Sequence, residues 1–273
     1  MIAGVTLERS GLRTSRLGLG TSRFHHMRTQ DRDRLVDSAL DLGIRHIDTA
    51  PSYGDTLAEC ELGRILGRRR ADVVLATKFG IPANPMMTTV PALAPPLRAA
   101  RALGRRAGLF HSKPRPMTAE DLKASVAASM RNLKTDWIDL LLLHEPSALT
   151  LPNADDVLRA LEDLKGKGVI RYFGLGGEWT GIATCLEACP ALGQVVQTHE
   201  HKWPTGSVSP DITYGAISPG PQSATLRKSV GTTDATARLQ QALQRRPDGV
   251  VLVSSTSPDR FANLAKACAQ VTV

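Results

Sequence analysis

DWIDLLLLHEP, at residues 136–146, contains an unbroken run of apolar residues that ends on a histidine. Such a short apolar run is typical of a strand that is buried on both faces, as in a parallel sheet. Similar runs rich in Val, Ile and Leu alternate along the chain with longer amphipathic segments. This pattern indicates parallel strands joined by crossover helices. We expect eight strands, at residues 17–20, 45–48, 73–78, 138–144, 170–175, 194–198, 212–217 and 249–253.

Helices are expected in most of the intervals between these strands. Thr118 is followed three residues later by Asp121, as in a capping box, and Asn153 can cap the next helix. Eight strand-helix units close into a barrel that commonly occupies about 250 residues as one domain. The sequence therefore predicts an α/β fold, a (β/α)8 TIM barrel formed as a single domain by residues 1–273. The expected helices are 32–42, 57–66, 119–133, 154–165, 180–188, 233–245 and 258–270.

Two intervals depart from the regular pattern. EHKWPTGSVSPD, at residues 200–211, contains two prolines and a glycine without helical periodicity, so we expect the sixth crossover helix to be reduced or absent. Residues 81–117 form a proline-rich stretch too long for a simple connection, and we expect a loop insertion after the third strand. A barrel carries its active site at the carboxyl ends of its strands. The insertion would therefore overhang the site and shape substrate choice, although a surface excursion is equally consistent with its composition.

The composition is that of a globular protein, with 42% hydrophobic and 22% charged residues. No segment approaches the roughly 20 consecutive apolar residues of a membrane span, and the amino terminus lacks the features of a secretory signal, so we expect a cytoplasmic protein. The net charge is +8, but the basic clusters are not interleaved with aromatic residues, which argues against nucleic-acid binding. The four cysteines lack C-x-x-C spacing, and we expect no metal site.

Three expected strands finish on potentially reactive side chains, namely Asp48, Lys78 and His144, and Tyr53 follows the second strand closely. Taken singly, each is more often a structural residue at the end of a strand. Because all four would open onto the same face of the barrel, they would together form a proton-transfer set. A tyrosine would act as the acid, a lysine would lower its pKa, a carboxylate would hold the lysine, and an imidazole would orient a carbonyl group.

The motifs around these residues resemble the signatures of the aldo-keto reductase family. The resemblance rests on HIDTAPSYG at 46–54, ATKFG at 76–80 and DWIDLLLLHEP at 136–146, in the family's order. RSGLRTSRLGLGT at 9–21 is similar to the family's opening, which implies an N-terminal β-hairpin that plugs the barrel before its first strand.

The resemblance implies specific roles for the four reactive residues. Tyr53 would be the general acid that protonates the carbonyl oxygen, and Lys78, paired with Asp48, would ease that proton transfer. His144 would hydrogen-bond the carbonyl oxygen and fix its approach. The implied activity is hydride transfer between a nicotinamide cofactor and a small aldehyde, ketone or sugar-like carbonyl compound, or the corresponding alcohol.

The resemblance extends to the cofactor site. Gln197 in VVQTHEH and Tyr214 in ITYGAIS match the family residues that contact the nicotinamide amide and stack on its ring. Ser255 and Arg260 in SSTSPDRFANL, at 254–264, match residues that grip the adenosine phosphate at a helix amino terminus. A guanidinium suits a 2′-phosphate, so NADPH is the expected cofactor and NADH the alternative.

Four positions depart from the family pattern. Gly176 and Gly177 in GLGGEW stand where the family has serine and asparagine, and two side-chain contacts to the carboxamide are thereby lost. Ser254 stands where the family often has lysine. The family asparagine near the end of this segment is either replaced by Leu264 or shifted to Asn263.

Two other functions are compatible with the sequence. A nucleotide-binding regulatory subunit with little turnover would fit the weakened carboxamide contacts. A lyase that uses Lys78 as a Schiff-base nucleophile is a further alternative, but a carboxylate partner such as Asp48 would keep the ammonium charged and non-nucleophilic. The expected partner is a small-molecule substrate, and the expected assembly state is a monomer.

Overall fold

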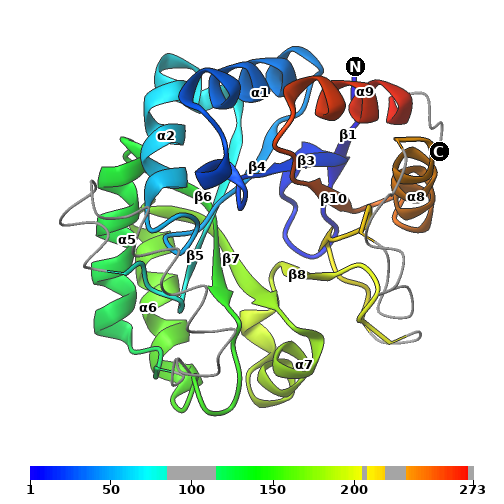
Figure 1. Cartoon of the computed structure of the whole chain (residues 1–273). Coiled ribbons are helices and arrows are strands. Elements are labelled where there is room, and N and C mark those ends of the chain that lie inside the picture. Colours follow the sequence, from blue (N-terminus) through cyan, green and yellow to red (C-terminus); the bar gives the residue numbers. More distant parts are fainter. Residues whose placement is uncertain (85–114, 205–207, 219–231, 270–273) are drawn as a thin grey trace, which may run out of the picture.

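The computed structural model of the chain describes residues 1–84, 115–204, 208–218 and 232–269. Within these residues eight parallel strands form a closed barrel, in which each strand pairs with the next along the chain and the last pairs with the first (Figure 1). The predicted barrel is therefore confirmed. The strands are β3 (Leu17–Gly20), β4 (His46–Asp48), β5 (Val74–Phe79), β6 (Ile138–His144), β7 (Ile170–Gly177), β8 (Val196–His199), β9 (Ile212–Tyr214) and β10 (Val250–Val253).

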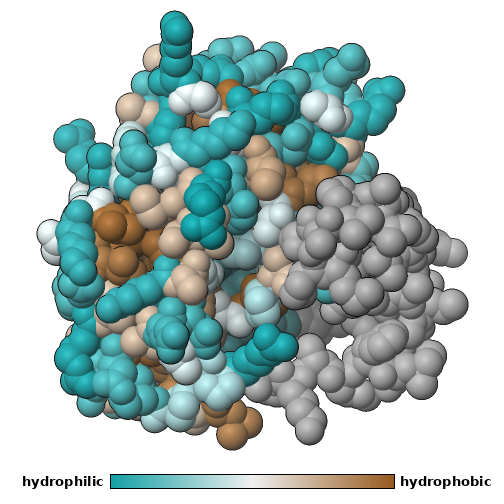
Figure 2. Space-filling view, turned by 90° about the vertical axis from the view of Figure 1, so that its left-hand side faces the viewer, coloured by the Kyte–Doolittle hydropathy of each residue, from teal (hydrophilic) through white to brown (hydrophobic). Residues whose placement is uncertain are grey.

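Helices surround the barrel and cover its outer face (Figure 1). Thr118 accepts a hydrogen bond from the backbone N–H of Asp121, and Asn153 accepts one from that of Asp156, as predicted for two helix starts. The face made by α2, α5 and α6 is mainly hydrophilic, with hydrophobic residues in small separate groups (Figure 2). The helices are α1 (Thr29–Asp41), α2 (Leu57–Leu66), α5 (Ala119–Leu133), α6 (Ala154–Gly166), α7 (Trp179–Ala188), α8 (Thr232–Arg245) and α9 (Pro258–Cys268).

Most differences from the expected elements are shifts of one to three residues at their ends. One of the largest shifts concerns the strand expected at 212–217, because β9 already ends at Tyr214. Gly215 adopts a positive φ of 81°, and the N–H of Ser218 donates to its carbonyl group, so the chain turns where the strand was expected to continue. Between β8 and β9 the described residues contain no helix, as predicted. Most of the expected insertion at 81–117 lies outside the described residues, so the division of the chain into one domain with an insertion stays a prediction.

An antiparallel hairpin, β1 (Gly4–Thr6) and β2 (Arg13–Ser15), precedes the barrel, as the resemblance implied. Leu7 and Leu12 in its turn are buried in the apolar cluster of the barrel interior, which includes Leu140 and Leu142. Arg9 in the same turn forms an ion pair with Asp211, the residue that precedes β9. The hairpin thus closes the amino-terminal end of the barrel and leaves the other end for the site.

The interior is filled by alternate residues of each strand, because successive side chains of a strand point to opposite faces. Leu140 and Leu142 of β6 belong to the interior cluster, whereas Leu141 and Leu143 pack outward against the helices. Gly18 of β3 also faces the interior, where there is no room for a side chain, because a Cβ there would lie 2.5 Å from the Leu252 side chain. The same alternation decides which residues at the strand ends face into the barrel.

Candidate active site

Polar residues replace apolar ones where the inward-facing rows reach the carboxyl ends of the strands. Lys78 lies two residues beyond inward-facing Ala76, and His144 lies two residues beyond Leu142. A cavity of about 710 Å³ opens at this end of the barrel. All ten residues predicted for catalysis or cofactor binding line it, namely Asp48, Tyr53, Lys78, His144, Gly176, Gly177, Gln197, Tyr214, Ser255 and Arg260.

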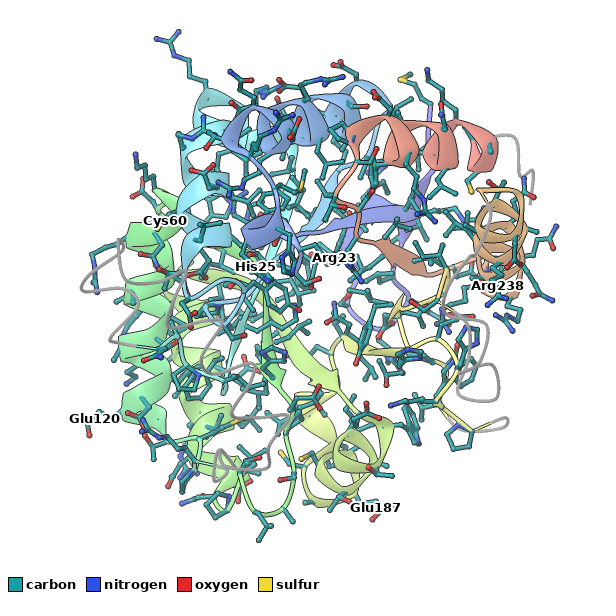
Figure 3. All side chains as sticks on the ribbon, viewed as in Figure 1. Arg23, His25, Cys60, Glu120, Glu187 and Arg238 are labelled. Atoms are coloured by element: carbon teal, nitrogen blue, oxygen red, sulfur yellow. The ribbon has the colours of Figure 1, made fainter. Side chains whose placement is uncertain are left out.

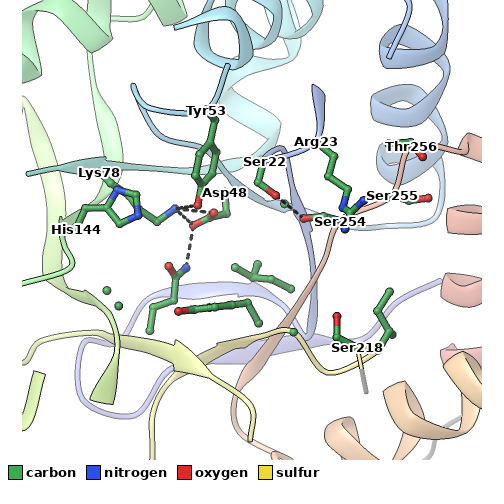
Figure 4. Close-up of a pocket in the computed structure, with 18 of the residues that line it drawn as sticks. Ser22, Arg23, Asp48, Tyr53, Lys78, His144, Ser218, Ser254, Ser255 and Thr256 are labelled. Atoms are coloured by element: carbon green, nitrogen blue, oxygen red, sulfur yellow. Dashed lines mark hydrogen bonds and ion pairs between the residues drawn. The ribbon is translucent and has the colours of Figure 1, made fainter. Parts of the chain in front are cut away.

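Lys78 connects two other members of the predicted proton-transfer set, Asp48 and Tyr53 (Figure 4). Its Nζ donates to both carboxylate oxygens of Asp48, at 2.8 and 2.7 Å, and to the Thr49 carbonyl oxygen at 2.9 Å. The same Nζ lies 3.2 Å from the hydroxyl oxygen of Tyr53. Lys78 is 2% exposed and Asp48 3%, so this ion pair is almost fully removed from water.

Tyr53 is carried by a tight loop between β4 and α2. Its N–H donates to the Ala50 carbonyl oxygen at 3.0 Å. The next three residues all have positive φ, and two of them, Asp55 and Thr56, are not glycine. Left-handed backbone at such residues costs roughly 1–3 kcal/mol each and is often found at active sites. The loop therefore holds the Tyr53 hydroxyl against Lys78 at the expense of local backbone strain.

Burial and charge shift the pKa values of these groups in different directions. Burial raises the pKa of Tyr53, while the nearby Lys78 ammonium opposes that rise. Burial would lower the pKa of Lys78, but Asp48 and Tyr53 raise it above its ordinary value, so the amine stays protonated. Burial, assisted by Lys78, lowers the pKa of His144 to about 3, so the imidazole is neutral at physiological pH.

His144 and Tyr53 lie on the same side of the cavity. Their ring centroids are 6.1 Å apart and the rings are nearly perpendicular. The Nδ1 atom of His144 is buried and has no hydrogen-bond partner among the described residues, which leaves Nε2 as its other polar atom. Because both side chains line the cavity, a small polar group bound there can meet both of them.

Gln197 is tied to the ion pair as well as to the cavity. Its Nε2 donates to Asp48 Oδ1 at 2.8 Å, so Asp48 receives bonds from both Lys78 and Gln197. The side-chain amide is thereby oriented, and its oxygen is left as an acceptor. Tyr214 is held from the side by His199, whose ring packs edge-on at a centroid distance of 5.4 Å.

A second group of polar residues lies on the side of the cavity away from Lys78 (Figure 4). Ser257 caps α9 by accepting a hydrogen bond from the Arg260 N–H, and the Ser255 hydroxyl donates to the Ser257 carbonyl oxygen at 2.9 Å. The Ser22 hydroxyl, in the loop after β3, donates to the Ser254 hydroxyl at 3.4 Å. Leu264 lines the cavity and Asn263 does not, which favours replacement of the family asparagine over its displacement.

Arg23 was not anticipated from the sequence. It follows β3 in the segment TSRFHH, lines the cavity and lies beside Ser254 and Ser255 (Figure 4). Figure 3 shows it near the middle of the open end of the barrel, whereas Glu120, Glu187 and Arg238 project from the outer helices. Within the described parts of the chain, Arg23 and Arg260 have no side-chain hydrogen-bond or ion-pair partner, so this half of the cavity is positively charged. The available signal was a basic residue in the loop that follows a barrel strand.

Glu145 was also missed, although it stands next to His144. It lines the cavity beside Gly176 and Gly177. Its side chain accepts a hydrogen bond from the Glu178 N–H at 2.9 Å.

A metal centre finds no support in the described residues, which contain no group of three or more His, Cys, Asp or Glu side chains arranged to hold an ion. Among the same residues, no helix is both long and apolar enough to cross a membrane.

Comparison with known proteins shows to which family the chain belongs. Residues 16–198 match the model of the aldo/keto reductase family. The chain is 32% identical over 183 residues to D-threo-aldose 1-dehydrogenase of a Pseudomonas species, a match that covers 61% of this chain and 51% of that protein. It is 30% identical over 197 residues to pyridoxal 4-dehydrogenase of Microbacterium luteolum, covering 66% and 57% respectively. The matched region thus spans little more than half the length of these curated relatives.

A solved structure shares the fold of this chain. An aldo-keto reductase from Klebsiella pneumoniae in complex with NADPH superimposes with a TM-score of 0.71 at 20% identity, and the match covers 100% of this chain and 92% of that one.

Proposed function

Because the chain belongs to the aldo/keto reductase family, we propose that it is an NADP(H)-dependent oxidoreductase acting on a small aldehyde, ketone or sugar-like carbonyl compound, or on the corresponding alcohol. One observation carries the proposal. A buried lysine joins a carboxylate to the hydroxyl group of a tyrosine in a cavity at the carboxyl ends of the barrel strands.

Tyr53 is the proton donor in this proposal. Its hydroxyl group loses a proton to the carbonyl oxygen, and the Lys78 ammonium 3.2 Å away stabilises the phenolate that remains. Asp48 keeps Lys78 charged and in place through two hydrogen bonds. The bound nicotinamide would supply the hydride during reduction and accept it during oxidation.

His144 orients the substrate in the same step. A neutral imidazole can donate one N–H to a carbonyl oxygen without adding a second cation beside Lys78. With its centroid 6.1 Å from that of Tyr53, His144 can share the substrate oxygen with the tyrosine hydroxyl. Two donors directed at one oxygen fix the carbonyl group for proton transfer.

The remaining lining residues fit an anionic dinucleotide. Tyr214 would stack on the nicotinamide ring, Gln197 would contact its amide, and Gly176 with Gly177 leaves room beside them. Ser255, Arg260 and the amino terminus of α9 would hold the adenosine phosphate. The planar Arg260 fork suits a 2′-phosphate, which favours NADPH over NADH.

Arg23 adds a contact that supports this cofactor. It supplies a positive charge near Ser254, where the family often has lysine. We assign it to the phosphates that NADPH and NADH share, because it follows β3, whereas Arg260 belongs to α9.

The substrate proposal rests on the cavity and on the relatives. Two relatives are named for an aldose and for pyridoxal, both small hydroxylated carbonyl compounds. We therefore expect a substrate of this size. A monomeric state and a cytoplasmic location stay predictions.

The Schiff-base alternative is disfavoured by the same ion pair. Lys78 donates to Asp48, Thr49 and Tyr53, and its raised pKa leaves little free amine to attack a carbonyl group.

Titration with NADPH, followed by loss of its absorbance in the presence of a panel of aldehydes and aldoses, tests the proposal. Binding with substrate-dependent oxidation is the expected result. Tight binding without oxidation of any compound would favour a regulatory nucleotide-binding subunit, and absence of binding would contradict the cofactor assignment. Trapping of a carbonyl adduct on Lys78 by borohydride would favour the lyase.

A further inference from the structure

Glu145 adopts a backbone conformation that is unusual for its residue type. It follows His144 directly and has a φ of 54°, in the left-handed region that a glutamate rarely adopts. Its N–H donates to the Gly176 carbonyl oxygen at 2.7 Å, which anchors the residue to the end of β7. The strained backbone turns the Glu145 side chain into the wall of the cavity instead of away from it.

The neighbouring glycine makes room for this side chain. A Cβ on Gly177 would lie 2.6 Å from Glu145 Oε2 and 2.9 Å from its Cα, and Gly177 itself has a φ of 154°. Any residue with a side chain at position 177 would therefore collide with Glu145. The Glu145 side chain can thus occupy this place only because position 177 is a glycine.

Among the residues that the structure describes, only one oxygen of the Glu145 carboxylate accepts a hydrogen bond. Oε2 accepts the hydrogen bond from the Glu178 N–H at 2.9 Å. No described residue donates to Oε1. Gln197 lies on the other side of the glycine pair, because a Cβ on Gly176 would be 3.3 Å from Gln197 Oε1. Two acceptor oxygens therefore flank Gly176 and Gly177 in the cavity.

We propose that Glu145 Oε1 accepts a hydrogen bond from the carboxamide N–H of the nicotinamide ring and takes the place of the side chains that Gly176 and Gly177 lack. This inference rests on the proposed function, since it requires a nicotinamide in the cavity. A carboxylate can only accept in this position, so the pocket selects a ring substituent that donates. Glu145 is a positioning residue for the ring and does not exchange protons with the substrate.

The test compares two cofactors that differ only in this substituent. Reduced 3-acetylpyridine adenine dinucleotide phosphate carries an acetyl group, which cannot donate, in place of the carboxamide of NADPH. Dissociation constants for both are measured by titration calorimetry with the wild-type protein and with Glu145→Gln. In this variant the amide oxygen can still accept from the Glu178 N–H, but its free end becomes a donor.

The wild-type protein is expected to bind NADPH about tenfold more tightly than the acetyl compound, as one hydrogen bond to a charged acceptor would provide. Glu145→Gln is expected to abolish this preference while its thermal unfolding stays close to that of the wild type. Glu178→Gln is the matched control, because it also removes one carboxylate but its side chain does not line the cavity. It is expected to keep the preference.

An unchanged preference in Glu145→Gln would overturn the inference and leave the proposed function intact. A changed KM for hydroxylated aldehydes with an unchanged cofactor preference would also overturn it, since Glu145 would then contact the substrate. Failure of the wild-type protein to bind either compound would remove the proposed cofactor and the inference with it.

Discussion

Replacement of Lys78 by methionine is expected to lower the free energy of unfolding by about 3–5 kcal/mol, because it leaves a buried carboxylate without its cation. Asp48 is 3% exposed, and without Lys78 its only side-chain donor among the described residues would be Gln197 Nε2 at 2.8 Å. A loss of this size is large against a total stability of about 5–15 kcal/mol, but the variant should still fold.

The partner variants distinguish the ion pair from a general effect on packing. Asp48→Asn removes the negative charge and leaves the Lys78 ammonium with neutral acceptors, among them the Thr49 carbonyl and the Tyr53 hydroxyl. The double variant, Asp48→Asn with Lys78→Met, leaves no isolated charge. We therefore expect it to be no less stable than either single variant, which corresponds to a coupling energy of about 3 kcal/mol or more.

Urea unfolding at pH 7, followed by circular dichroism, measures the three variants against the wild type. Losses that simply add in the double variant would refute the reasoning. So would a loss below about 1 kcal/mol in Lys78→Met, since a buried ion pair cannot be broken at so small a cost.

Two further predictions concern the cofactor and the pH dependence of stability. Arg260→Ala should weaken NADPH binding about tenfold and NADH binding much less, whereas Arg23→Ala should weaken both, as measured by titration calorimetry. Burial lowers the pKa of His46 to about 4 and that of His144 to about 3. Below about pH 6.5 the folded protein therefore binds fewer protons than the unfolded chain. The free energy of unfolding then decreases as the pH is lowered. Urea unfolding should detect a loss of about 1.6 kcal/mol per histidine between pH 6.5 and pH 5.

Each of these predictions has a contrary outcome. If Arg260→Ala weakened the binding of NADPH and NADH equally, Arg260 would not contact the 2′-phosphate. A free energy of unfolding that stays constant from pH 6.5 to pH 5 would mean that neither histidine is buried in the neutral form. His201→Gln, which alters an exposed histidine, serves as the control for the pH series.

The barrel could be predicted because its signal is repeated and local. The apolar run of β6 is long enough to mark a strand buried on both faces, and its end at His144 was placed correctly. The end of β9 was misplaced because Gly215 and the residues after it continue an apolar pattern while the backbone turns. A turn of this kind depends on a single positive φ, which hydrophobic periodicity does not register.

The site was predictable where it depended on residue type at a strand end, and not where it depended on contacts across the barrel. Asp48, Lys78 and His144 follow from alternation along their own strands. The bond between Gln197 and Asp48 joins β8 to β4, and the close approach of Glu145 to Gly177 joins the segment after β6 to β7. Neither contact can be predicted from the residue spacing within one segment. Glu145 was therefore overlooked, although it stands next to a predicted residue.

The rate of NADPH oxidation by Tyr53→Phe is the measurement that tests the proposed mechanism most directly. The substitution removes the hydroxyl group that Lys78 contacts and leaves the ring that packs near His144. With an aldehyde that the wild-type protein reduces, turnover should fall by about 100-fold or more, while the dissociation constant for NADPH stays nearly unchanged. A variant that turns over at the wild-type rate would contradict the assignment of Tyr53 as the proton donor.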